Sequence, residues 1–130
     1  MIASHSLFSN NQALVSGGAI VVDGGSLFSF ETDYVGNSAT GYPATQSFGN
    51  GGALDICGTE HDIFRFEGGK FSNNTAAQAG GAIHIQSGDF RSISFIAKNA
   101  HFTKNFASGS GSCVSSSACV EGLLLPPFPV

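Results

Sequence analysis

A six-residue motif recurs four times along this chain. Each copy begins with an aromatic residue, which is followed three positions later by Asn and two positions after that by Ala; the copies cover residues 8–13, 34–39, 71–76 and 102–107. The first three copies each precede a Gly-Gly-Ala triplet, at residues 17–19, 51–53 and 80–82. Successive copies begin 26, 37 and 31 residues apart. A repeat of this length with variable spacers is typical of a solenoid, in which each repeat packs on its neighbours.

Apolar residues alternate with other residues after each Gly-Gly-Ala triplet. The alternating apolar residues are Ile20 and Val22, Leu54 and Ile56, and Ile83 and Ile85, with Val21, Asp55 and His84 between them. Alternation with period two predicts a strand with one buried face. A second alternating run covers residues 28–30, 64–66 and 93–95, where Ser29, Arg65 and Ser94 are the expected outward residues. With the six-residue motif as a third segment, we expect three strands in each turn.

Strands that recur at such variable spacing favour a coil over a meander of antiparallel hairpins. Hairpins prefer two-residue turns, and residues 23–25 supply the one candidate, Asp-Gly-Gly, whose counterparts in the later repeats are longer and different. Crossovers between parallel strands are nearly always right-handed. The sequence therefore predicts an all-β fold, a right-handed single-stranded parallel β-helix of about three turns with an irregular C-terminal tail. We expect residues 1–112 to form the helix and 113–130 a degenerate last turn with a Pro-rich tail.

Each residue of the motifs has an expected structural role. The Gly pairs Gly17–Gly18, Gly51–Gly52 and Gly80–Gly81 would allow backbone angles and a close approach that a Cβ blocks. The motif aromatics Phe8, Tyr34, Phe71 and Phe102 would stack in the interior. The motif asparagines Asn11, Asn37, Asn74 and Asn105 suit a corner, where the amide bonds local backbone and tolerates a left-handed conformation. Aligned on successive turns, these amides could also bond one another as a ladder.

Composition limits the classes of partner. The formal net charge of −4 gives no electrostatic reason to expect binding to nucleic acid or to an anionic membrane. No stretch approaches the roughly 20 apolar residues that span a bilayer, so we expect no transmembrane segment in this chain. The N-terminal residues lack the pattern of a signal peptide, so an exported protein would be part of a longer chain. The open ends of a short stack expose unpaired strand edges, which predicts self-association through those ends.

The segment Phe71-Ser-Asn-Asn-Thr-Ala-Ala-Gln-Ala-Gly-Gly-Ala-Ile83 resembles the repeat of the chlamydial polymorphic membrane proteins. The resemblance covers about residues 8–107, and the last Gly-Gly-Ala is degraded to Gly-Ser-Gly-Ser-Cys-Val at 109–114. It implies a surface-displayed β-helix of an autotransporter adhesin, at the cell surface or outer membrane or secreted, which attaches to a host-cell protein or glycan. It implies neither catalysis nor a cofactor.

One linker is longer than its counterparts and is the expected binding loop. Eleven residues, 40–50, separate Ala39 from Gly51, whereas the corresponding linkers hold three residues each. Excess length must leave the coil as a surface loop, and binding in solenoids often lies on such loops. This loop carries Tyr42 and Phe48. We therefore expect a binding site formed by Tyr42, Phe48 and the outward row Val21, Asp55 and His84.

Two alternative functions stay open. Asp55 and His84 occupy equivalent positions of consecutive repeats, and a carboxylate–imidazole pair can act as a base, as in a polysaccharide-cleaving, pectate-lyase-like enzyme. The second alternative is a decayed repeat fragment without function.

Metal binding and disulfide formation are less clearly indicated. The four histidines share no ligand spacing, and no Cys-x-x-Cys pair occurs, so we expect no metal site. The short gap between Cys113 and Cys119 allows a local disulfide, which would leave Cys57 free or available for an intermolecular bond.

Overall fold

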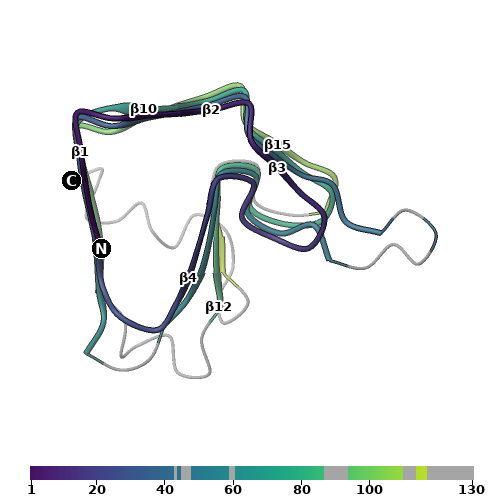
Figure 1. Ribbon diagram of the computed structural model, residues 1–130, viewed down its shortest axis with the longest axis horizontal. Helices are drawn as coiled ribbons and strands as arrows, with labels where there is room; N and C mark the ends of the chain where they lie inside the picture. Colours follow the sequence, from purple (N-terminus) through teal and green to yellow (C-terminus); the bar gives the residue numbers. More distant parts are fainter. Residues whose placement is uncertain (43, 45–47, 59–60, 87–93, 110–113, 117–130) are drawn as a thin grey trace.

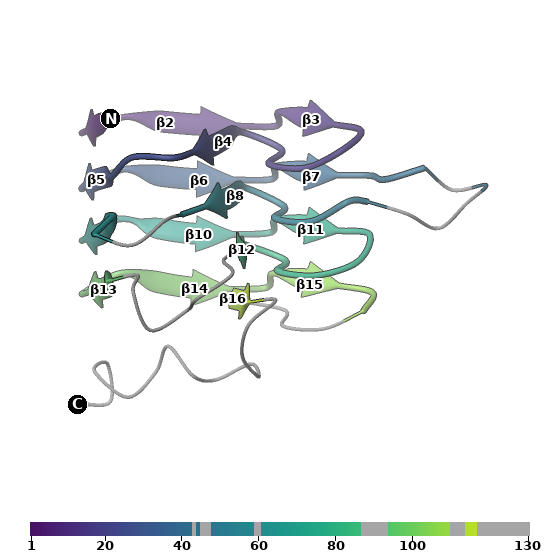
Figure 2. The same cartoon turned by 90° about the horizontal axis from the view of Figure 1, so that it is seen from below.

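The computed structural model describes residues 1–42, 44, 48–58, 61–86, 94–109 and 114–116. Every regular element in these ranges is a β-strand, and every strand pair is parallel. Successive turns of the chain stack directly on one another (Figure 2). The fold is the expected parallel β-helix.

Each turn contributes one strand to each of four sheets, which we number in the order that the chain visits them. Sheet I contains β1 (Ile2–Ser4), β5 (Leu27–Phe30), β9 (Ile63–Glu67) and β13 (Ser94–Lys98). Sheet II contains β2 (Leu7–Ser9), β6 (Asp33–Val35), β10 (Lys70–Ser72) and β14 (His101–Thr103). Sheet III contains β3 (Gln12–Ala13), β7 (Ser38–Ala39), β11 (Thr75–Ala76) and β15 (Phe106–Ala107). Sheet IV contains β4 (Ile20–Asp23), β8 (Leu54–Cys57), β12 (Ile83–Gln86) and β16 (Val114–Ser116).

The expected three strands per turn and three turns were therefore too few. The six-residue motif supplies two strands, in sheets II and III, because its Asn forms a corner between them. Four strands in each sheet make four turns. The additional strands are β1, near the N-terminus, and β16, which pairs with β12 although its Gly-Gly-Ala triplet is degraded.

Viewed down the stack, sheets I, II and IV surround the main core (Figure 1). Sheet III and its connection to sheet IV form a narrow side lobe. This lobe projects from the main ring next to strands β4 and β12 (Figure 1). The inward residues of sheet IV are the expected apolar pairs, and Leu54, Ile56, Ile83 and Ile85 are fully buried. The short strands of sheet III bury their alanines in the side lobe, as Ala39 and Ala76 show.

The aromatic residues of the motif form a continuous stack inside sheet II. Ring centroids lie 5.2 Å apart for Phe8 and Tyr34, 4.5 Å for Tyr34 and Phe71, and 4.8 Å for Phe71 and Phe102, with interplanar angles of 8° or less. Tyr34 and Phe71, in the two inner turns, are almost entirely buried. The predicted interior stack is confirmed.

The predicted asparagine ladder is also confirmed. The Nδ2 of Asn37 donates to Oδ1 of Asn74 at 3.0 Å, and the backbone N–H of Asn37 donates to the same oxygen at 2.9 Å. The second Nδ2 hydrogen of Asn37 bonds the carbonyl of Phe8, one turn back, at 2.9 Å. Asn74 repeats this pattern one turn further along, with Asn105 as its acceptor and Tyr34 in the place of Phe8.

Two details of the asparagine prediction were wrong. The amides bond the backbone of the neighbouring turn rather than local backbone. The left-handed conformation belongs to the residue before each ladder Asn, namely Asn10, Gly36, Asn73 and Lys104. Because the preceding residue takes the left-handed conformation, the side-chain amide of each ladder Asn can point along the stack.

Each Gly of a Gly-Gly-Ala triplet has its own role, as expected. The first adopts a left-handed conformation, with φ of 58° at Gly17, 67° at Gly51 and 67° at Gly80. The second lies against the backbone of the following turn: a Cβ on Gly52 would overlap the Gly81 carbonyl and lie 2.7 Å from the backbone N of Thr75. Glycine is required there because two backbones nearly touch.

Sheet I departs from the predicted alternation in its second turn. The inward residues of β5 are Leu27 and Ser29, whereas Phe28 and Phe30 lie on the outer face and stack at 6.5 Å. In register, Leu27 pairs with Phe64 and Ser29 with Phe66. Ser29 was expected to point outward. It points inward instead, and its hydroxyl lies in the core beside the hydroxyl of Tyr34. Phe95 rather than residue 93 pairs with Phe64; residue 93 lies outside the described residues.

Candidate functional site

The outer face of sheet IV brings the predicted row together. Val21 pairs with Asp55, and Asp55 pairs with His84, on three successive turns. Outer positions of one sheet face the same way, so the three side chains form a line along the stack. Their exposure differs strongly, because Val21 is 53% exposed whereas His84 is 6% exposed.

Asp55 and His84 form a close pair within this row. Nδ1 of His84 donates to Oδ1 of Asp55 at 2.7 Å, and the two side chains are 8% and 13% exposed for His84 and Asp55 respectively. The expectation that all three row residues would be exposed was therefore wrong for His84. This hydrogen bond joins the two side chains at the surface of the sheet, and Val21 is the accessible member of the row.

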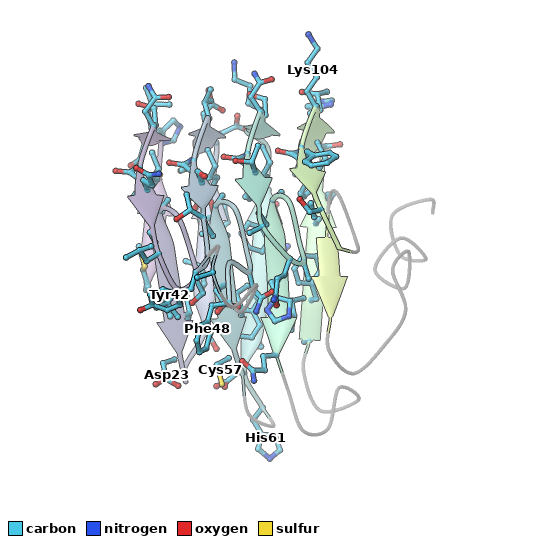
Figure 3. The ribbon with its side chains drawn as sticks, turned by 90° about the vertical axis from the view of Figure 1, so that its right-hand side faces the viewer. Asp23, Tyr42, Phe48, Cys57, His61 and Lys104 are labelled. Carbon is cyan, nitrogen blue, oxygen red and sulfur yellow. The ribbon has the colours of Figure 1, made fainter. Side chains whose placement is uncertain are left out.

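The predicted binding loop presents its two aromatic side chains to solvent. Tyr42 is 42% exposed and Phe48 is 49% exposed. Their rings meet edge to face, with centroids 5.6 Å apart and planes at 75°. Figure 3 shows both side chains on the side of the molecule that carries sheet III. The edge-to-face contact gives the pair a defined shape, which a single exposed ring would lack.

The base of this loop is tied to the turns on both sides. The N–H of Gly49 bonds the Val15 carbonyl of the first turn at 2.6 Å, and the Gly49 carbonyl accepts from Gln78 N–H of the third turn at 2.9 Å. Phe48 itself has a φ of 69°, which is uncommon for a bulky residue and costs conformational energy. The packing of the loop base therefore holds Phe48 in a conformation that it would otherwise avoid.

A thiol and a carboxylate lie side by side at the end of sheet IV, and the sequence interpretation did not consider them together. Asp23 pairs with Cys57, and Figure 3 shows both at the lower edge of the molecule. Partial desolvation of the thiol, followed by the negative charges of Asp23 and Asp55, raises the pKa of Cys57 above its ordinary value. Alignment of the Gly-Gly-Ala triplets already places both residues at the same repeat position, so this pair could have been found.

A second feature that was missed is the aromatic pair on the outer face of sheet I. Phe28 and Phe30 were predicted to be inside, yet both are half-buried on that surface. Arg65 lies opposite Phe28 in the next turn and forms an ion pair with Glu67. Alternation alone could not identify this face, because both faces of β5 carry an apolar or aromatic residue.

Metal and disulfide chemistry have little support in the described ranges. No group of three His, Cys, Asp or Glu side chains there could hold a metal ion. Cys57 is exposed with a free thiol, and the suggested Cys113–Cys119 bridge lies outside the described residues. Within the same ranges, no helix has the length and apolar character needed to cross a membrane.

Comparison with known protein families supports the repeat assignment. Residues 5–23 and 69–86 match the Chlamydia polymorphic membrane protein repeat. The two matched segments correspond to the same part of the coil, which runs through sheets II, III and IV in the first and third turns. No curated protein and no solved structure matches the chain. In its first and third turns this β-helix is therefore similar to the repeat of the Chlamydia polymorphic membrane protein family.

Proposed function

We propose that this chain is a non-catalytic β-helix segment of a surface-displayed, autotransporter-like adhesin. The repeat match supports a chlamydial surface protein of this type, located at the surface or outer membrane. The proposed contact site is the loop of residues 40–50, and the proposed partner is a host-cell surface protein or glycan.

The observation that carries this proposal is the Tyr42–Phe48 pair. Within the described residues, the motif aromatics in the two inner turns are buried, whereas these two rings are about half exposed and held against each other. Exposed aromatic side chains are enriched among the residues that dominate binding energy at interfaces. The scaffold does not need the pair, because the first and third turns make the same connection with three residues.

Val21 extends the proposed contact surface on sheet IV. It is the exposed member of its row, whereas Asp55 and His84 bond each other and are mostly covered. We therefore assign the direct contacts to Tyr42, Phe48 and Val21. The Asp55–His84 pair has a supporting role, in which it fixes the two neighbouring strands at the surface.

Cell binding by the purified chain tests the loop directly. The double variant Tyr42→Ser/Phe48→Ser should lose saturable binding to host cells, while its far-ultraviolet circular dichroism and unfolding midpoint stay unchanged. Phe106→Ser is the matched control, because Phe106 is 58% exposed on sheet III and belongs to no proposed contact. Equal binding by both variants would overturn the role of the loop.

The Asp55–His84 hydrogen bond is the one observation that favours an enzyme instead. A carboxylate-bound imidazole can accept a proton, and β-helix enzymes that cleave polysaccharides carry polar residues on an outer sheet face. Against this, the next residue of the row is Val21, so the polar row is short. Depolymerisation of acidic polysaccharide that is lost in both Asp55→Ala and His84→Ala would establish the enzyme and refute the non-catalytic reading.

A further inference from the structure

The outer face of sheet I lies along the flank of the stack rather than at either end. In the view down the stack, no described segment of the chain lies outside this sheet (Figure 1). Its outward residues form two rows that run from turn to turn. The first row contains Ile2, Phe28, Arg65 and Ile96. The second row contains Ser4, Phe30, Glu67 and Lys98.

The two rows carry apolar and charged side chains that stay accessible to solvent. Ile2 is 73% exposed, and Phe28 and Phe30 are half-buried, with nearly parallel rings whose centroids lie 6.5 Å apart. In the next turn, Nε of Arg65 lies 2.5 Å from Oε2 of Glu67, and these side chains are 40% and 32% exposed. Aromatic and arginine side chains are enriched among the residues that dominate binding energy at interfaces. This face therefore has the composition of a contact surface.

The arrangement of the two rows makes the face complementary to itself. A two-fold axis that runs along the stack, midway between the rows, sets the first row of one copy against the second row of another. In the third turn, Arg65 of each copy then faces Glu67 of the other. In the second turn, Phe28 of each copy faces Phe30 of the other. Opposite charges and aromatic rings are thus matched in the same contact.

We propose that the outer face of sheet I is a docking site for the same face of a second copy of this chain. The two coils lie side by side and run in the same direction, and the two sheets pack face to face at the usual spacing of about 10 Å. A two-fold axis along the strands of the third turn would instead set Arg65 against Arg65 and Glu67 against Glu67. Like charges repel in that arrangement, so the charge pattern selects the axis along the stack.

The dimer should be weak and reversible. A face of four short strands is smaller than the roughly 800 Å² per partner that a stable interface buries. The contact closes on itself, because both copies use the same surface, and association therefore stops at two copies. The inference goes beyond the proposed function, since it does not involve the loop of residues 40–50.

Reversing the charges at Arg65 and Glu67 tests the contact. Arg65→Glu gives the face two acidic side chains, and Glu67→Arg gives it two basic ones, so each variant alone sets like charges against each other. In an equimolar mixture, the acidic face of one variant meets the basic face of the other. Each change shifts the net charge of −4 by two units, in opposite directions, so both variants stay negative and have no general attraction for each other.

Sedimentation velocity at concentrations up to the solubility limit measures the association. We expect each variant alone to associate at least about tenfold more weakly than the unmodified chain, and the mixture to recover to within about threefold of it. Both variants break the Arg65–Glu67 ion pair within the chain, and mixing cannot restore that pair, so recovery reports contact between copies. The proposal would be overturned by a mixture that does not recover, by single variants that associate like the unmodified chain, or by an unmodified chain that stays monomeric.

A second pair of variants tests the aromatic part of the contact. Phe28→Ser/Phe30→Ser removes both outward rings and should weaken association about tenfold or more. Phe106→Ser is the matched control, because Phe106 is 58% exposed on sheet III and lies away from this face, and it should associate like the unmodified chain. Equal association of the double variant and the control would overturn the proposed arrangement.

Discussion

Oγ of Ser29 lies 3.0 Å from the hydroxyl oxygen of Tyr34, and both side chains are buried in the core. In the other turns, Phe takes the place of Tyr34, and the residue at the position of Ser29 in sheet I is apolar: Ala3, Phe66 or Ala97. The core thus accepts a tyrosine only in the turn where a neighbouring strand supplies a hydroxyl. This relationship explains why β5 turns Ser29 inward and leaves Phe28 and Phe30 outside.

A double-mutant cycle should show this coupling. Tyr34→Phe and Ser29→Ala each leave one buried hydroxyl without its partner, so each should lower the free energy of unfolding by about 1–3 kcal/mol. The double variant removes both hydroxyls and should cost less than the sum of the single changes. Urea unfolding of the four proteins gives the coupling energy. Strict additivity would contradict the buried hydrogen bond.

Alkaline unfolding should depend on Tyr34. Burial raises the pKa of Tyr34 above its ordinary value, an effect that the Ser29 hydrogen bond partly offsets. The unfolded chain therefore ionises this tyrosine first, and the free energy of unfolding should be unaffected below about pH 10 and fall above it. Tyr34→Phe should reduce this fall, measured as the urea midpoint between pH 9 and 11. An unchanged pH slope would show that Tyr34 does not contribute.

Replacing a ladder asparagine should lower the free energy of unfolding most in the interior of the stack. Asn74 accepts two hydrogen bonds and donates two, and it is fully buried. Asn74→Ala should lower the free energy of unfolding by about 3 kcal/mol or more, because it leaves several buried groups unpaired. Asn11→Ala, in the first turn, removes one side-chain hydrogen bond and should cost about 1 kcal/mol. Equal costs in chemical denaturation would contradict the ladder.

A methyl group at the second glycine of a triplet should disrupt the stack. Gly52→Ala would overlap the Gly81 carbonyl and crowd Thr75, so it should destabilise the fold by about 3 kcal/mol or more. Gly24→Ala is the control, because nothing lies within 4 Å of a Cβ there and only its φ of 81° opposes the change. We expect about 1–2 kcal/mol for the control. Comparing the thermal unfolding midpoints of both variants shows which costs more stability: the backbone contact at Gly52 or the positive φ at Gly24.

The Cys57 thiol should react slowly with alkylating reagents as long as Asp23 carries its negative charge. Asp23→Asn removes a negative charge and a side-chain hydrogen bond that raise the pKa of Cys57, so alkylation near pH 7.5 should become faster. Iodoacetamide labelling followed by mass spectrometry measures the rate, with Cys113 and Cys119 changed to Ser. Asp33→Asn, on sheet II, is the charge-matched control and should leave the rate unchanged.

Much of the fold and part of the site follow from repeat spacing. Aligning the motifs predicted the aromatic stack, the ladder and the sheet IV row, because in a parallel coil equivalent residues become neighbours. The exposure of Tyr42 and Phe48 followed from the length of their linker. The burial of His84 did not follow, because the hydrogen bond with Asp55 joins two different turns and is seen only in the tertiary structure.

The repeats alone imply that the chain coils, because a repeated aromatic–Asn–Ala and Gly-Gly-Ala unit buries its apolar face against copies of itself. The four strands of each turn could be seen only in the folded chain, since the corner at each ladder Asn forms through hydrogen bonds to the next turn. The inward choice of Ser29 over Phe28 was likewise decided across strands, by the hydroxyl of Tyr34. Local alternation sets which residues share a face, and contacts between turns select the face that is buried.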